Sequence, residues 1–124
     1  MSMCRMLLSI NPQHVENILN GNKIFEFRKV RCRADVEKIV IYATSPVMKI
    51  VGEADILEII QDEVDKVWEI TSVNAGISRQ FYDEYYQGKD QAVAYRLGKV
   101  KKYRRPLHLS DFGISFAPQS FVYI

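Results

Sequence analysis

The sequence is poor in the residues that build disulfide-rich or metal-bound proteins. Its 124 residues include two cysteines, Cys4 and Cys32, and two histidines, His14 and His108. The cysteines are too few for a disulfide framework and lack the paired spacing of a zinc site. Neither histidine stands near them at ligand spacing. We therefore expect free thiols, no metal and no cofactor.

Long apolar runs are also missing. No stretch approaches the roughly 18 apolar residues of a membrane span, and residues 1–10 lack the apolar core and cleavage site of a signal peptide. We expect no membrane association and a cytoplasmic location. With 48% hydrophobic and 26% charged residues, the chain can bury one core, which predicts a single domain over residues 1–124.

Charge is small in sum but uneven along the chain. The net charge is +2, yet residues 53–69 hold seven acids against one lysine, and residues 89–105 hold seven bases against one acid. The basic segment is the candidate nucleic-acid surface. Charge alone is equally compatible with a solvated edge strand kept basic against aggregation. The bases expected to hold phosphate are Lys99, Lys101, Lys102, Arg104 and Arg105.

The pattern of apolar residues predicts an α+β protein. From apolar runs or alternation we expect strands over residues 6–10, 23–29, 38–43, 48–60, 91–103 and 121–124. From N-caps, helical spacing and glycine stops we expect helices over residues 12–20, 64–71 and 78–88. Without regular βαβ units, this order favours a small, mainly antiparallel barrel with about three helices packed around it.

A short motif follows the first expected helix. Residues 21–28 read Gly-Asn-Lys-Ile-Phe-Glu-Phe-Arg, which resembles the ASCH signature Gly-x-Lys-x-x-Glu-x-Arg. Later segments agree with the family in order, namely residues 41–46, 51–53, 81–86 and 103–109. By this resemblance the chain is identified as a member of the ASCH family, similar to small prokaryotic stand-alone members.

The resemblance implies a PUA-like β-barrel with a polar cleft lined by Lys23, Glu26 and Arg28. It implies a partner that is RNA or a nucleoside, and a role in RNA metabolism or in regulation linked to transcription or translation. Members similar in fold include an N4-acetylcytidine amidohydrolase and proteins proposed to cleave RNA. A hydrolase acting on RNA or a modified nucleoside is therefore the alternative function, and a protein-interaction module is the third.

Each motif residue has a functional and a structural interpretation. Lys23 and Glu26 can perform acid–base chemistry if burial shifts their pKa values, and Arg28 offers a planar donor fork that suits a phosphate or a base edge. A solvated lysine and a Glu26–Arg28 salt bridge compete with these roles, because residues two apart on a strand point the same way. In the acetylcytidine hydrolases the position of Glu26 is a threonine, which is thought to supply the nucleophilic hydroxyl. This chain has no hydroxyl at that position, which argues against covalent hydrolysis by that route.

Three further cleft candidates lie at the end of the strand over residues 38–43. Tyr42 can stack a base, and Thr44 or Ser45 can place a hydroxyl at the cleft. Capping a turn is the competing role of the two hydroxyl residues.

The aromatic helix and two acids complete the set of candidates. Tyr82, Tyr85 and Tyr86 can stack a splayed base, although their helical spacing favours the core. Glu53 and Glu69 are both candidates for a second catalytic acid, and the sequence does not decide between them.

Overall fold

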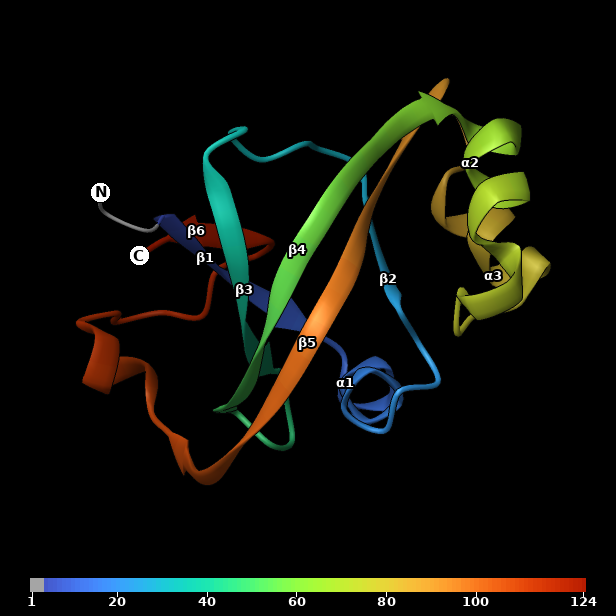
Figure 1. The fold of residues 1–124 in the computed structure, drawn as a ribbon. Helices are drawn as coiled ribbons and strands as arrows, with labels where there is room; N and C mark the ends of the chain where they lie inside the picture. Colours follow the sequence, from blue (N-terminus) through green and yellow to red (C-terminus); the bar gives the residue numbers. More distant parts are fainter. Residues whose placement is uncertain (1–3) are drawn as a thin grey trace.

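The structure, a computed structural model, describes residues 4–124 and contains a curled sheet flanked by helices (Figure 1). The strands are β1 (Cys4–Ile10), β2 (Phe25–Arg28), β3 (Val36–Ala43), β4 (Lys49–Glu63), β5 (Gln91–Leu107) and β6 (Phe121–Tyr123). The helices are α1 (Pro12–Leu19), α2 (Val64–Thr71) and α3 (Arg79–Tyr85), with 3₁₀ turns η1 (Ser72–Asn74) and η2 (Leu109–Phe112). Each expected element is therefore present, with its ends moved by a few residues.

The six strands form a single sheet in the order β2-β5-β4-β3-β1-β6. All neighbours are antiparallel except β1 and β3, which run parallel because α1 and β2 lie between them in the chain. The long strands β4 and β5 cross the whole molecule as a twisted ribbon (Figure 1). This arrangement confirms the predicted mainly antiparallel, barrel-like sheet with three helices.

Gly52 marks a close backbone approach in the β4–β5 ribbon. The register shifts between Ile50 and Gly52, and a Cβ on Gly52 would lie 2.6 Å from the carbonyl oxygen of Lys101. The same Cβ would lie 3.3 Å from Leu19 Cδ2, at the end of α1. The missing side chain at Gly52 therefore lets α1 pack against the ribbon.

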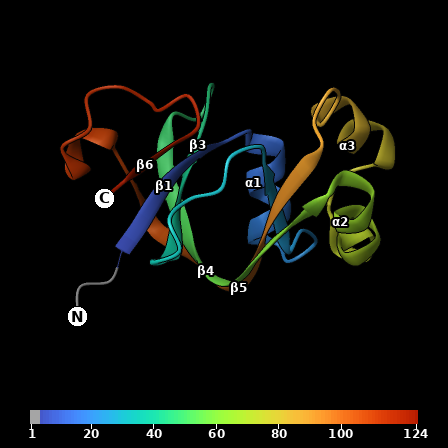
Figure 2. The same ribbon diagram turned by 90° about the horizontal axis from the view of Figure 1, so that it is seen from above.

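Apolar side chains gather in three clusters around the sheet. The largest lies between α1 and the concave side, and includes Ile18, Ile39 and Tyr95. A second fills the space beneath α2 and α3, which stand together at one end of the molecule (Figure 2). The third lies under η2 and the C-terminal segment, around Tyr42 and Ile50. The cavity described next opens between the first two clusters.

Candidate functional site

A cavity of about 520 Å³ opens between α1, β2 and the segment that begins α3. Its volume lies in the range of pockets that bind small ligands. The three motif residues Lys23, Glu26 and Arg28 line it together. Its remaining walls are Ile10, Asn11, Gln13, His14, Phe27, Gly76, Ile77, Ser78, Phe81 and Tyr85.

Backbone hydrogen bonds from three directions position Lys23. Its amide donates to the Asn17 carbonyl oxygen of α1 at 3.0 Å. The next residue, Ile24, donates to the Asn74 carbonyl oxygen at 3.1 Å and accepts from Leu97 of β5 at 2.8 Å. The lysine backbone is therefore fixed by a helix, a loop and a strand at once.

The Lys23 side chain is only 2% exposed. Its Nζ donates to the Ala75 carbonyl oxygen at 2.7 Å and lies 4.8 Å from the centre of the Phe27 ring. Burial lowers the pKa of Lys23 to about 8, while the charge of Glu26 raises the pKa and that of Arg28 lowers it. The amine can therefore exchange a proton near physiological pH.

Gly76 makes room for this lysine. Its φ is +72°, and a Cβ at this position would lie 2.5 Å from the Lys23 Cβ. Only a residue without a side chain lets the loop before α3 pass this close to the lysine stem.

Glu26 and Arg28 form a shielded ion pair beside the lysine. Arg28 donates from Nε at 3.0 Å and from Nη2 at 2.8 Å to a single oxygen, Oε2 of Glu26. Within residues 4–124 no hydrogen bond reaches the other oxygen, Oε1, and this atom is not sealed from solvent. The predicted Glu26–Arg28 pair is therefore present, and Glu26 keeps one acceptor free; its role toward a ligand stays a prediction.

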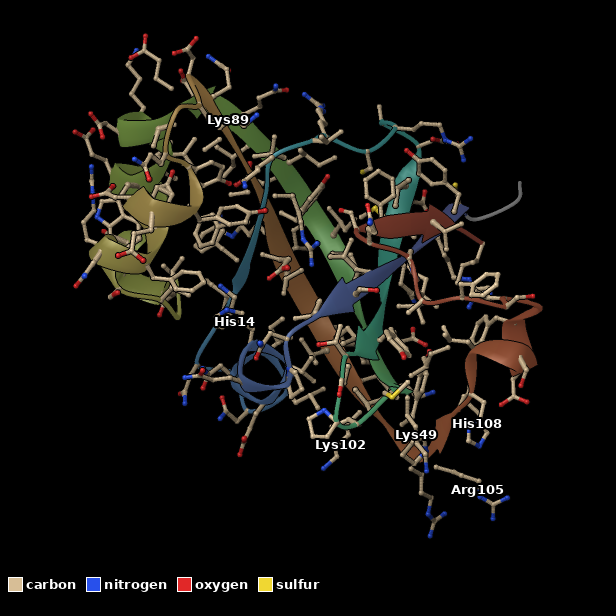
Figure 3. All side chains as sticks on the ribbon, turned by 180° about the vertical axis from the view of Figure 1, so that it is seen from behind. His14, Lys49, Lys89, Lys102, Arg105 and His108 are labelled. Carbon is tan, nitrogen blue, oxygen red and sulfur yellow. The ribbon has the colours of Figure 1, made fainter. Side chains whose placement is uncertain are left out.

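His14 enters the cavity from the first turn of α1 (Figure 3). Its Nδ1 is buried and has no hydrogen-bond partner among the described residues, and its ring meets Phe81 edge to face, with centroids 5.4 Å apart. Burial lowers the pKa of His14; the charges of Lys23 and Arg28 lower it further, and that of Glu26 raises it. A neutral imidazole therefore stands beside two cations.

Sequence reasoning considered His14 only as a metal ligand and passed over Phe81. The signal that could have found them was their position, one in the helix before the motif and one at the start of the aromatic helix. Of the three tyrosines of that helix, Tyr82 and Tyr86 are buried in the core and Tyr85 lines the cavity.

The other cleft candidates lie elsewhere. Tyr42 is 2% exposed and lines a second hollow near η2. Thr44 and Ser45 begin the turn after β3, where the Thr44 amide donates to the Ile10 carbonyl oxygen at 3.0 Å, but neither lines the cavity.

The basic segment of β5 is solvent-exposed but does not form one face. Lys101 pairs with Glu53 and Lys102 with Gly52 across the ribbon, so these two lysines point to opposite sides of the sheet. The expected phosphate-binding residues Lys99, Lys101, Lys102, Arg104 and Arg105 are all exposed.

The described residues offer no metal site and no membrane helix. Between residues 4 and 124 no group of three or more His, Cys, Asp and Glu side chains is placed to hold a metal ion. None of the helices in that range has the length and apolar character needed to cross a membrane.

The curled six-stranded sheet with its three helices matches the PUA-like fold of ASCH proteins. The crystal structure of ASCH from Zymomonas mobilis superposes with a TM-score of 0.87 at 29% identity, covering 97% of this chain and 87% of that chain. The chain belongs to the family described as Domain of unknown function (DUF365), which matches residues 8–118, and the ASCH resemblance is confirmed.

Two curated relatives extend this result. A Zymomonas mobilis protein named ASCH domain-containing ribonuclease is 34% identical over 106 residues, 85% of this chain and 71% of the relative. A Ureaplasma parvum protein named ATP synthase subunit alpha is 36% identical over 120 residues, 96% of this chain. The chain spans only 15% of the length of that second relative.

Proposed function

We propose that this chain binds single-stranded RNA and takes one nucleotide into the cavity between α1, β2 and α3. The single observation that carries the proposal is the placement of Lys23, Glu26 and Arg28 in one cavity with aromatic rings on its walls. Two cations against one carboxylate leave a net positive charge, which favours an anionic ligand. Rings beside cations are the usual means of holding unpaired nucleotides.

Glu26 suggests which bases fit. Its free oxygen Oε1 accepts hydrogen bonds, so it favours a base that presents an amino group, as cytosine and adenine do. Uracil offers no amino group and can pair with this acceptor only through its single N3–H donor. We expect oligocytidylate or oligoadenylate to bind more tightly than oligouridylate of the same length.

Fluorescence polarisation with eight-nucleotide single strands tests the proposal across a salt series. Affinity should fall as salt rises, should depend on the base, and should drop in Lys23→Met. Glu26→Gln replaces one carboxylate oxygen by an amide donor. It should reduce the difference in affinity between oligocytidylate and oligouridylate. Lys89→Gln is the matched control, because Lys89 is exposed, does not line the cavity and lies apart from His14, which does (Figure 3). Absence of binding at low salt would overturn the proposal.

A second candidate function is RNA cleavage. It is favoured by two titratable side chains, Lys23 and His14, that line the same cavity. In this scheme His14 takes the proton of a 2′-hydroxyl, whose oxygen attacks the adjacent phosphorus. The bond from phosphorus to the 5′-oxygen breaks, and the Lys23 ammonium gives a proton to that leaving oxygen. The products are a 2′,3′-cyclic phosphate and a free 5′-hydroxyl.

This chemistry needs a neutral His14 and a protonated Lys23 at once. Because the pKa of His14 is lowered and that of Lys23 is about 8, the rate should decline above pH 8 and at acidic pH. Gel analysis of labelled RNA with wild type, His14→Gln and the exposed-site control Lys89→Gln checks this. Cleavage that survives in His14→Gln as well as in the Lys89→Gln control would exclude the scheme.

A further inference from the structure

Basic side chains gather at the end of the sheet away from α2 and α3. Figure 3 shows Lys49, Lys102, Arg105 and His108 projecting there together, from the start of β4, the second half of β5 and the segment after it. All four are exposed. Lys49 and Arg105, which are 56 residues apart in the chain, thus belong to one basic end, which we define as Lys49, Lys102, Arg105 and His108.

The charges of this basic end are unneutralised. Across residues 4–124, no carboxylate lies within 4 Å of the side-chain nitrogens of Lys49, Lys102 or Arg105, although Lys38, Arg79 and Arg96 all have such partners. The nearby Asp111 carboxylate accepts a hydrogen bond from the His108 backbone amide at 2.9 Å. The basic end therefore retains its capacity to bind an anion.

A hollow of about 490 Å³ opens at this end, with His108 and Met48, the residue before Lys49, in its wall. It lies between the turn that precedes β4 and the η2 segment, and Tyr42 contributes to its wall. Met48, at 60% exposure, presents an apolar side chain to solvent at its edge. The rest of the lining is His108, Leu109, Ser110, Gly113, Ile114 and Ser115. Apolar and ring surfaces thus stand next to free cations and hydroxyl groups.

We propose that this hollow is a second RNA subsite, in which a base lies against Met48 and His108 while Lys49 and Arg105 bind phosphates. The inference rests on the proposed function, because the same strand would occupy both sites.

Binding as a function of RNA length separates the two sites. For wild type we measure affinity for oligocytidylates of two to ten nucleotides. We expect affinity to increase once the strand is long enough to reach the hollow. The variant Lys49→Gln/Arg105→Gln should abolish that increase and should lower the slope of log K against log salt by about 0.7 for each phosphate that the variant no longer binds. Its affinity for dinucleotides should match that of wild type.

Two controls keep the outcomes distinct. Lys89→Gln/Arg96→Gln removes the same charge elsewhere and should keep the increase of affinity with length. Ser115→Leu, at an exposed position of the hollow, should reduce this increase without changing charge. The subsite is overturned if the affinity of wild type does not increase with length, or if both double variants weaken binding equally. Failure to bind RNA of any length would instead reject the proposed function and this subsite with it.

Discussion

Arg28 of β2 donates from Nη2 to the carbonyl oxygen of Ser9 in β1 at 2.8 Å. These strands are separated by three others in the sheet, so the hydrogen bond joins two distant parts of the curled sheet across the cavity. The same guanidinium holds Glu26. The residue expected to bind ligand is therefore also a structural tie.

Arg28→Ala should lower the free energy of unfolding by about 3–5 kcal/mol, because it leaves Glu26 buried without its cation. The pair is well shielded, with side chains 13% and 7% exposed. Arg96→Ala breaks the pair with Glu58, whose side chains are half exposed, and should cost less than about 1 kcal/mol. Urea unfolding measures both, and equal losses would refute the structural role of Arg28.

Gly76→Ala should destabilise the protein more than Gly88→Ala. Both glycines have positive φ, +72° and +79°, so each alanine carries a backbone strain of about 1–2 kcal/mol. Only at Gly76 does the added Cβ also collide with Lys23, since nothing lies within 4 Å of a Cβ at Gly88. Thermal unfolding and RNA polarisation should show the larger stability loss, and any loss of binding, in Gly76→Ala alone. A matching effect in Gly88→Ala would contradict this close approach.

Lys23 should make stability increase with pH in the mildly alkaline range. The pKa of Lys23 is about 8 in the folded protein, against an ordinary value of 10.5. Between these values the unfolded chain holds a proton that the folded protein has released, so the free energy of unfolding rises with pH. From pH 7.5 to 9.5 the rise is about 2 kcal/mol.

Lys23→Met isolates this effect, because every other titrating group is shared by the two proteins. The difference in unfolding free energy between wild type and variant should change by about 2 kcal/mol from pH 7.5 to 9.5. A constant difference would show that the lysine titrates normally and would remove it as a proton donor near pH 8.

Phe81→Ala should weaken RNA binding by about 1–3 kcal/mol, the usual contribution of one stacked base. Phe81 lines the cavity and is 45% exposed, so its removal should cost little stability. Phe116 is 85% exposed and lies outside the cavity wall, which makes Phe116→Ala the matched control. Equal affinity in the Phe81 variant and wild type would show that the ring does not contact RNA.

The residues of the motif could be placed from the sequence because their relationship is local. Alternation along β2 puts Glu26 and Arg28 on one side, and the structure joins them by two hydrogen bonds. Phe25 and Phe27 take the other side and pack in the core under α2 and α3.

Contacts between distant segments were beyond that reasoning. His14 meets Phe81 only because α1 and α3, which are 60 residues apart in the chain, converge on β2. Tyr42 was expected at the cleft, yet its side chain faces the C-terminal segment on the other side of the sheet. The direction of a side chain at the end of a strand depends on which face each layer covers, and no local pattern carries that information.

Both ends of the described chain lie together. The Ile124 amide donates to the Arg5 carbonyl oxygen at 3.0 Å, and β6 runs beside β1 at the edge of the sheet farthest from β2 in strand order. A short peptide linker would therefore join residues 5 and 124 with little distortion. Circular permutation with new ends opened near Val30, an exposed residue after β2, should yield a folded protein.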